Sequence, residues 1–217
     1  IFPHHENEIA QSEAANGKEF SRYWMHNGFL NIDNRKMSKS LGNFFTVREI
    51  SEKYDLQVLR FFMLSAHYRS PLNFSAELME AAKSGLERII TAAERLKFLM
   101  GSAKTEDMAE TEAEKFAKSA EYVGNFESAM DDDFNTADAI AAVFDLVKFI
   151  NTMTDEDSSK EYLENLFDRL VRLTEVLGII VDKEDEILDS DIEALIAERQ
   201  AARKEKNFAR ADEIRDE

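Results

Sequence analysis

The sequence contains no cysteine, so no disulfide can hold the chain together and no cysteine within it can complete a metal site. Only seven glycines and two prolines are spread over 217 residues, too few for the many tight turns of a β-sandwich or barrel. No apolar run approaches the roughly 20 residues that span a bilayer. The chain also starts without methionine and without a targeting pattern. We therefore expect a mostly helical, cytoplasmic protein without a membrane partner, and a chain that is part of a longer one.

Basic charge is scarce as well, and it is unevenly distributed. The formal net charge is −17. Residues 1–75 hold nine Lys and Arg against eight Asp and Glu, whereas residues 76–217 hold 18 against 36. An acidic surface repels phosphate at long range. Any contact with nucleic acid must therefore use local basic patches, and the near-neutral first segment is the first place to look for one.

The first 45 residues predict short elements of mixed type. Residues 6–16 predict a helix that Gly17 closes. Residues 21–32 combine aromatic and apolar side chains, which favours a strand. Residues 33–45 predict a polar loop.

The next segment carries two helix starts. Thr46 and Glu49 have the spacing of a capping box, which predicts a helix running to about residue 54. Asp55 can cap a second helix. The expected apolar face of that second helix consists of Val58, Leu59, Phe62 and Met63.

From residue 75 onward, apolar residues recur at steps of three and four, which indicates amphipathic helices. We expect four of them, the first ended by Gly101, the third starting near Thr136 and the fourth ended by Gly178. Their expected core positions are Leu78, Ala82, Leu86, Ile89, Ala93, Leu96 and Met100; Phe116, Ala120, Val123 and Phe126; Ile140, Val143, Phe144, Val147 and Ile150; Leu163, Leu166, Phe167, Leu170, Leu173 and Leu177. Such helices with short links predict an antiparallel bundle. A capping box at residues 190–193 opens a last expected helical pair.

A histidine and a carboxylate lie four residues apart near the start of the chain. If a helix begins at His4, the side chains of His4 and Glu8 share one face and could hold one zinc ion. His5 is expected to face elsewhere. Two ligands are only half of a zinc site, so an ordinary solvated or capping pair is the competing interpretation.

A basic loop precedes the capping box. Lys36 and Lys39 flank a methionine and a serine, and a second serine follows at position 40. Such a loop can fold over a triphosphate, and its two ammonium groups can neutralise the charge that grows as a phosphoryl bond breaks. An ordinary exposed basic loop is the alternative, but the full run of residues 36–43 favours a function.

These motifs resemble a known family. Residues 36–40, Lys-Met-Ser-Lys-Ser, match in full the second signature of class I aminoacyl-tRNA synthetases, and residues 2–13 resemble the cysteinyl member of that class. Four further segments are similar to the same family: residues 23–29, 62–75, 130–136 and 203–215. Ala137 stands where the family usually has proline, and either residue suits a first helical turn. The chain thus resembles the C-terminal part of a cysteinyl-tRNA synthetase.

The resemblance assigns catalytic roles to the basic loop. It implies that Lys39 meets the phosphates of ATP and that Lys36 assists, with Met37, Ser38 and Ser40 in the same ATP-binding loop. The implied reaction activates cysteine as cysteinyl adenylate and transfers it to cysteine tRNA, with ATP and magnesium as substrate. The whole protein is expected to be a monomer.

The resemblance also assigns the metal. It implies that His4 and Glu8 ligate one zinc ion together with two cysteines that lie upstream of this chain. A zinc ion held in this way would bind the thiolate of the substrate cysteine and disfavour the hydroxyl of serine. Because those cysteines and the family's first, His-rich signature are not in this sequence, we expect the chain alone to be inactive.

The implied architecture is mainly α. A remnant of a Rossmann-like α/β catalytic domain is expected in residues 1–45, a helical connector in 46–75, a DALR-like antiparallel bundle in 76–182 and the start of an anticodon-binding domain in 187–217. Residues 195–217 hold six basic and six acidic side chains, so a solvated helix face and a tRNA contact are equally open there. The basic cluster expected to contact tRNA is Arg199, Arg203, Lys204, Lys206 and Arg210.

Two other functions stay open. The related ligase that joins cysteine to a glucosaminyl inositol in mycothiol synthesis shares the zinc and basic-loop chemistry, but it needs no anticodon domain, so residues 191–217 argue against it. The chain could also be a non-catalytic helical module that binds tRNA. In either case we expect the bundle from about residue 76 to 180 to fold by itself, and residues 1–45 to be less firmly held.

Overall fold

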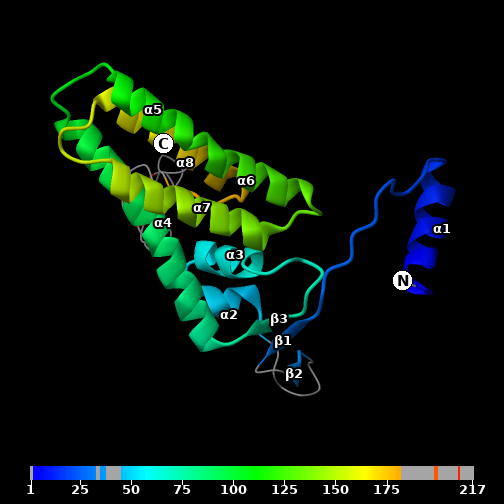
Figure 1. The fold of residues 1–217 in the computed structure, drawn as a ribbon. Coiled ribbons are helices and arrows are strands. Elements are labelled where there is room, and N and C mark those ends of the chain that lie inside the picture. Colours follow the sequence, from blue (N-terminus) through cyan, green and yellow to red (C-terminus); the bar gives the residue numbers. More distant parts are fainter. Residues whose placement is uncertain (1, 33–34, 38–44, 182–197, 200–209, 211–217) are drawn as a thin grey trace. The chain divides into compact units, whose positions relative to one another are not determined.

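The computed structural model describes residues 2–32, 35–37, 45–181, 198–199 and 210, and these are mainly helical, as predicted (Figure 1). The elements are α1 (His4–Asn16), β1 (Leu30–Ile32), β2 (Arg35–Lys36), α2 (Val47–Ser51), α3 (Leu56–Leu64), β3 (Leu72–Phe74), α4 (Ala76–Ser102), α5 (Glu110–Lys118), α6 (Ala120–Asp131), α7 (Thr136–Met153) and α8 (Lys160–Val176). None of the helices in the described ranges combines the length and the apolar character needed to cross a bilayer.

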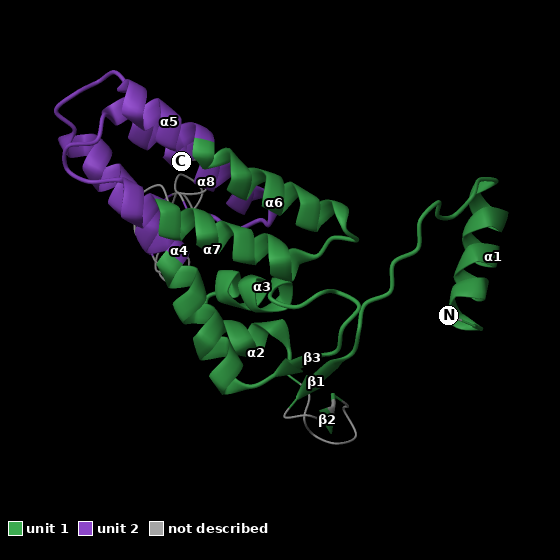
Figure 2. Cartoon of the chain, in the orientation of Figure 1, with its two compact units in different colours: residues 1–88, 118–149 green, residues 89–117, 150–217 purple. Residues whose placement is uncertain are grey.

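The chain divides into two compact units (Figure 2). Unit 1 consists of residues 1–88 and 118–149, and unit 2 of residues 89–117 and 150–217. Helices α4 and α7 each contribute residues to both units. The expected helical pair opened by the capping box at residues 190–193 lies outside the described residues.

A small mixed sheet in unit 1 has the strand order β2-β1-β3. Strand β1 pairs antiparallel with β2, placing Asn31 opposite Lys36, and parallel with β3, placing Ile32 opposite Phe74. The predicted strand over residues 21–32 is therefore wrong for most of its length. Its aromatic residues look like strand residues in sequence, but Tyr23 and Phe29 are 87% and 69% exposed and no described strand pairs with residues 21–29.

Local capping signals were predicted well. Helix α1 starts two residues earlier than expected, and Gly17 ends it with a left-handed φ of 61° while donating its N–H to the Glu13 carbonyl at 2.9 Å. Thr46 and Glu49 form the complete capping box of α2. Asp55 caps α3 by accepting the amide of Gln57 at 2.7 Å. Helix α2 is shorter than predicted, since it ends at Ser51.

The core of unit 1 forms where α3, α4 and α7 bury apolar side chains. The Phe61 ring lies edge-on to Phe144 with the centroids 6.2 Å apart, and a Cβ at Gly85 would lie 3.0 Å from Phe61. A glycine on α4 thus lets an aromatic ring approach the helix closely. The buried face of α3 is shifted from the predicted one, because Phe61 is buried whereas Met63 is 50% exposed.

The predicted second bundle helix is two helices. Helix α5 ends at Lys118 and α6 begins at Ala120, with the buried Ser119 between them. Neither glycine nor proline marks this break in the sequence. It falls next to the boundary between the two units. Ala120, expected in the core, is exposed.

Helices α8 and α4 each supply five buried apolar side chains to the core of unit 2. Leu163, Leu166 and Leu170 are fully buried, as predicted, and Gly178 follows α8 with a left-handed φ of 65°. The Tyr162 hydroxyl is also buried and has no hydrogen-bond partner among the described atoms. Burial, with smaller contributions from Glu112 and a second carboxylate, raises the pKa of Tyr162 to about 12.

A buried carboxylate fixes the start of α8. Glu112 is 9% exposed, and its Oε1 accepts the Ser159 amide at 2.9 Å while Oε2 accepts the Ser159 hydroxyl at 2.6 Å. The Ala109 amide also donates to Oε2 at 3.0 Å. Burial alone would raise the pKa of Glu112, but these hydrogen bonds outweigh it and the pKa is lowered.

Candidate functional site

Helix α1 brings His4 and Glu8 onto one face, as their spacing predicted. His4 Nε2 lies 3.3 Å from Glu8 Oε1. The expectation that His5 faces elsewhere is wrong, because His5 Nδ1 lies 2.8 Å from Glu8 Oε2. Residues three apart on a helix are neighbours as well as residues four apart, so one carboxylate can meet both rings. Each oxygen of Glu8 thus meets one imidazole.

An aromatic cluster that sequence reasoning did not assign to the site surrounds His5. The His5 ring centroid lies 5.4 Å from that of Trp24 and 5.3 Å from that of His26. Trp24 and His26 stack with an interplanar angle of 16°. The side chain of His5 is 31% exposed against 78% for His4, so His5 is the more enclosed of the two imidazoles. The only sequence feature that could have suggested this cluster is the Trp-x-His spacing of residues 24–26.

The side chains of His4 and Glu8 are of the types that bind zinc. Zinc takes imidazole nitrogen and carboxylate oxygen, and it usually binds four ligands. Within the described part of the chain, no group of three or more His, Cys, Asp or Glu side chains is placed to hold a metal ion. Among the described residues, His4 and Glu8 offer two such ligands and no complete site is formed.

The basic loop begins on strand β2. Lys36 pairs with Asn31 across the sheet, and Met37 is half-buried. The loop expected over residues 33–45 thus contains a short strand, since β1 offers an edge with which Arg35 and Lys36 pair. Ser38, Lys39 and Ser40 lie outside the described residues.

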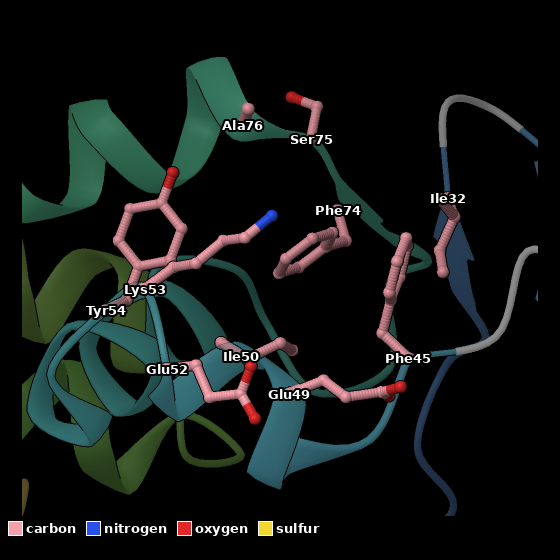
Figure 3. A pocket seen from close by; sticks show the side chains of 10 residues that line it. All are labelled: Ile32, Phe45, Glu49, Ile50, Glu52, Lys53, Tyr54, Phe74, Ser75 and Ala76. Atoms are coloured by element: carbon pink, nitrogen blue, oxygen red, sulfur yellow. The ribbon is translucent and has the colours of Figure 1, made fainter.

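A cavity of about 530 Å³ lies beside this sheet in unit 1 (Figure 3). Phe45 and Phe74 face the cavity from one side. Lys53, which follows helix α2, extends its ammonium group into the cavity. Tyr54 lies in the wall of the cavity. Burial raises the pKa of Tyr54, and the hydrogen bond and negative charge of Glu80 raise it further. Of the predicted metal and ATP residues whose side chains the structure describes, His4, Glu8 and Met37 do not line it.

The predicted basic cluster is described only at two of its members. Arg210 Nε and one terminal nitrogen each lie 3.0 Å from Glu198 Oε1, so this guanidinium is paired with a carboxylate. Arg199 has a buried Nε. Arg203, Lys204 and Lys206 lie outside the described residues.

The chain is similar in sequence to known protein families. Residues 1–84 match the family model of the class I (C) tRNA synthetase catalytic domain, and residues 125–181 match the DALR domain. Over all 217 residues the chain is 65% identical to a cysteine–tRNA ligase of Lachnospira eligens. The chain belongs to the cysteine–tRNA ligase family. It is also 54% identical to the cysteine–tRNA ligase of Lachnoclostridium phytofermentans, over 99% of this chain.

The chain spans about half the length of these relatives, 46% of the first and 47% of the second. A solved structure is also similar: the agnB2 LeuRS of Agrobacterium radiobacter K84 in a ternary complex with tRNA and LeuAMS. It aligns with 73% of this chain and 22% of its own at a TM-score of 0.58 and 20% identity. This likeness shows a shared fold. Membership in the cysteine–tRNA ligase family confirms the resemblance drawn from the motifs, and the mainly α architecture agrees with it.

Proposed function

We propose that the whole protein to which this chain belongs is an ATP-dependent cysteine–tRNA ligase, which activates cysteine as cysteinyl adenylate and transfers it to cysteine tRNA. The observation that carries the proposal is 65% identity to a named cysteine–tRNA ligase along every residue of the chain. The proposal includes cysteine, ATP with magnesium and cysteine tRNA as partners, a monomeric state and a cytoplasmic location.

In this proposal Lys36 and Lys39 bind the phosphates of ATP, with Met37, Ser38 and Ser40 in the same loop. Support comes from strand β2, which starts the loop, and from the pairing of Lys36 with Asn31 at the edge of the sheet. Two ammonium groups in a loop that starts there can neutralise phosphate charge as pyrophosphate leaves. Their contribution is electrostatic and needs no proton transfer.

The metal part of the proposal concerns α1. His4 and Glu8 would hold zinc together with two cysteines from outside this chain, and the bound ion would supply a soft Lewis acid that prefers the thiolate of cysteine to a hydroxyl. His5 would act on Glu8 rather than on the metal, because its hydrogen bond at 2.8 Å fixes one carboxylate oxygen.

We also propose the domain division expected from the sequence, with a catalytic-domain remnant in residues 1–45, a connector in 46–75, a DALR-like bundle in 76–182 and the start of an anticodon-binding domain in 187–217. The matched ranges 1–84 and 125–181 support the order of the first and third parts. Within the last part, Arg199, Arg203, Lys204, Lys206 and Arg210 are the proposed tRNA contacts.

The test is cysteine-dependent ATP–pyrophosphate exchange by the full-length protein. Lys39→Ala should lower the exchange rate by about a hundredfold or more, the scale seen when one electrostatic donor to a transition state is removed. Lys83→Ala is a matched control, because Lys83 is an exposed lysine on α4, outside the lysine loop, and its loss should leave the rate unchanged. The 217-residue chain alone should show no exchange. A full-length wild type without cysteine-dependent exchange would overturn the proposal.

A further inference from the structure

Tyr68 connects two parts of unit 1 that are far apart in sequence. It lies between α3 and β3, and its carbonyl accepts the amide of Gly28 at 2.6 Å, just before β1. Its hydroxyl donates to Asp133 Oδ1 at 2.8 Å, in the turn between α6 and α7, 65 residues along the chain. One residue is therefore bonded both to the chain entering the sheet and to a turn of the helical segment.

The backbone end of this connection has little freedom. A Cβ placed on Gly28 would clash with the Ser70 carbonyl oxygen, so only glycine fits beside this segment. The Leu72 amide then donates to the Phe29 carbonyl at 3.0 Å, and β3 continues in parallel register with β1. The position of the Tyr68 backbone therefore sets the position of β1, and β1 carries Lys36 on its other edge through β2.

The side-chain end of the connection is a strained turn. Asp133 and Phe134 both have left-handed backbones, with φ of 57° and 55°. Two successive non-glycine residues keep this conformation only when their surroundings hold them. Here the Phe134 amide donates to the Met130 carbonyl at 3.1 Å, and the carboxylate of Asp133 is held by Tyr68 and by Arg69 Nε at 3.0 Å.

The polar groups around the Asp133 carboxylate are not equivalent. The Arg69 side chain is 66% exposed, and an ion pair in water contributes little. His67 Nε2 lies 3.8 Å from Asp133 Oδ2, beyond hydrogen-bond distance. The Tyr68 hydroxyl is part-buried and donates a short hydrogen bond to the Asp133 carboxylate. This is therefore the strongest of the three contacts.

We propose that Tyr68 and Asp133 are positioning residues for cysteine activation: the bond between their side chains fixes the strand pair that presents Lys36 relative to the α6–α7 turn. The inference rests on the proposed function. It joins the two family-matched segments, since Gly28 and Tyr68 lie within residues 1–84 and Asp133 within residues 125–181. Neither residue touches substrate in this proposal; both act through the sheet on the backbone of Lys36.

The experiment compares Tyr68→Phe, which removes only the hydroxyl, with Tyr122→Phe in the full-length protein. Tyr122 lies in the same unit, on α6, with its ring centroid 5.6 Å from that of Phe149, so its substitution controls for losing a phenol. We expect Tyr68→Phe to lower kcat for ATP–pyrophosphate exchange by about tenfold, equivalent to about 1.4 kcal/mol in the barrier, with KM for cysteine unchanged. Tyr122→Phe should match the wild type.

Two further variants test the partner. Asp133→Asn keeps an oxygen that accepts from Tyr68, and asparagine tolerates the left-handed backbone, so activity should stay within about threefold of wild type. Arg69→Met should do the same. Asp133→Asn combined with Tyr68→Phe should be no slower than Tyr68→Phe alone, because both changes act on one bond.

Hydrogen exchange at Gly28 and across β1 gives a readout independent of activity. Protection there should fall in Tyr68→Phe and stay unchanged in Tyr122→Phe, with both variants folded at the assay temperature by circular dichroism. A Tyr68→Phe variant with wild-type kcat and wild-type protection of β1 overturns the positioning role while leaving the ligase assignment standing. An inactive wild type would instead overturn the ligase assignment, and protection of β1 would still decide whether the link exists.

Discussion

Helices α1 and α8 are similar in length but differ in what they bury. Helix α1, in unit 1, has no buried residue among its 13, and Tyr23 and Phe29, which follow it in the sequence, are largely exposed. Helix α8, in unit 2, buries six of its 17 residues: Tyr162, Leu163, Leu166, Leu170, Leu173 and Thr174. Most of the stability of a helix in a protein comes from packing an apolar face. Helix α8 is thus a core helix, whereas α1 is held by its Gly17 cap, its side-chain pairs and the ring contacts of His5.

Native-state hydrogen exchange should show the largest contrast between the two helices. The amides of α8 should exchange only through global unfolding, while those of α1 open locally, so protection factors should differ by about a thousandfold or more. The measurement is exchange followed by mass spectrometry or NMR on the 217-residue chain. Helix α3 serves as an internal reference, because it also lies in the synthetase-matched segment and buries Val58, Phe61 and Phe62. Equal protection of α1 and α8 would contradict this contrast.

A single core truncation should sharpen the comparison. Leu166→Ala in α8 removes a fully buried side chain and should lower the free energy of unfolding by about 3 kcal/mol, within the range measured for such cavities. Leu78→Ala in α4 is the matched control, since Leu78 is 42% exposed and should cost less than about 1 kcal/mol. Urea unfolding followed by circular dichroism measures both. A larger loss at Leu78 would show that the sequence pattern, which predicted both as core, is the better guide.

The exposure of Leu78, a predicted core residue, illustrates what sequence alone could and could not predict. Capping motifs were predicted correctly at Gly17 and at Thr46 because their hydrogen bonds close within three or four residues. The phase of a buried face depends on distant neighbours, and α4 therefore buries Met79 rather than Leu78. For the same reason the aromatic run of residues 21–29 looked like a strand although no described strand pairs with it.

The site was predictable in part for a related reason. His4 and Glu8 share a helix, so their spacing alone placed them together. The position of His5 against Trp24 and His26 depends on how the chain folds back after Gly17, which no local pattern encodes. The bond between Tyr68 and Asp133 spans 65 residues, and both lie in segments that resembled the family without any sign that they meet.

The smallest expected effect concerns how the two helices begin. Helix α1 follows Pro3 without a side-chain cap, whereas the N-cap Ser159 of α8 accepts the Tyr162 amide and donates to the buried Glu112. Glu112→Gln keeps an oxygen acceptor but gives up the charge and leaves an amide to be accommodated. It should lower the free energy of unfolding by about 1.5 kcal/mol at neutral pH, the lower end of the range for hydrogen bonds to a charged group, because one oxygen acceptor remains. Glu114→Gln, at an exposed site on the same helix, should cost almost nothing.

The pH dependence of that difference decides whether the charge of Glu112 is what matters. Because the folded-state pKa is lowered from its ordinary value of 4.5, the carboxylate stabilises the fold above about pH 4.5 and that stabilisation is lost as the pH falls through the folded pKa. The gap between wild type and Glu112→Gln should therefore be full at pH 7 and close on acidification. Parallel urea midpoints for the two proteins from pH 7 to pH 3 would mean that shape rather than charge holds the start of α8, and the advantage of α8 over α1 would then rest on apolar packing alone.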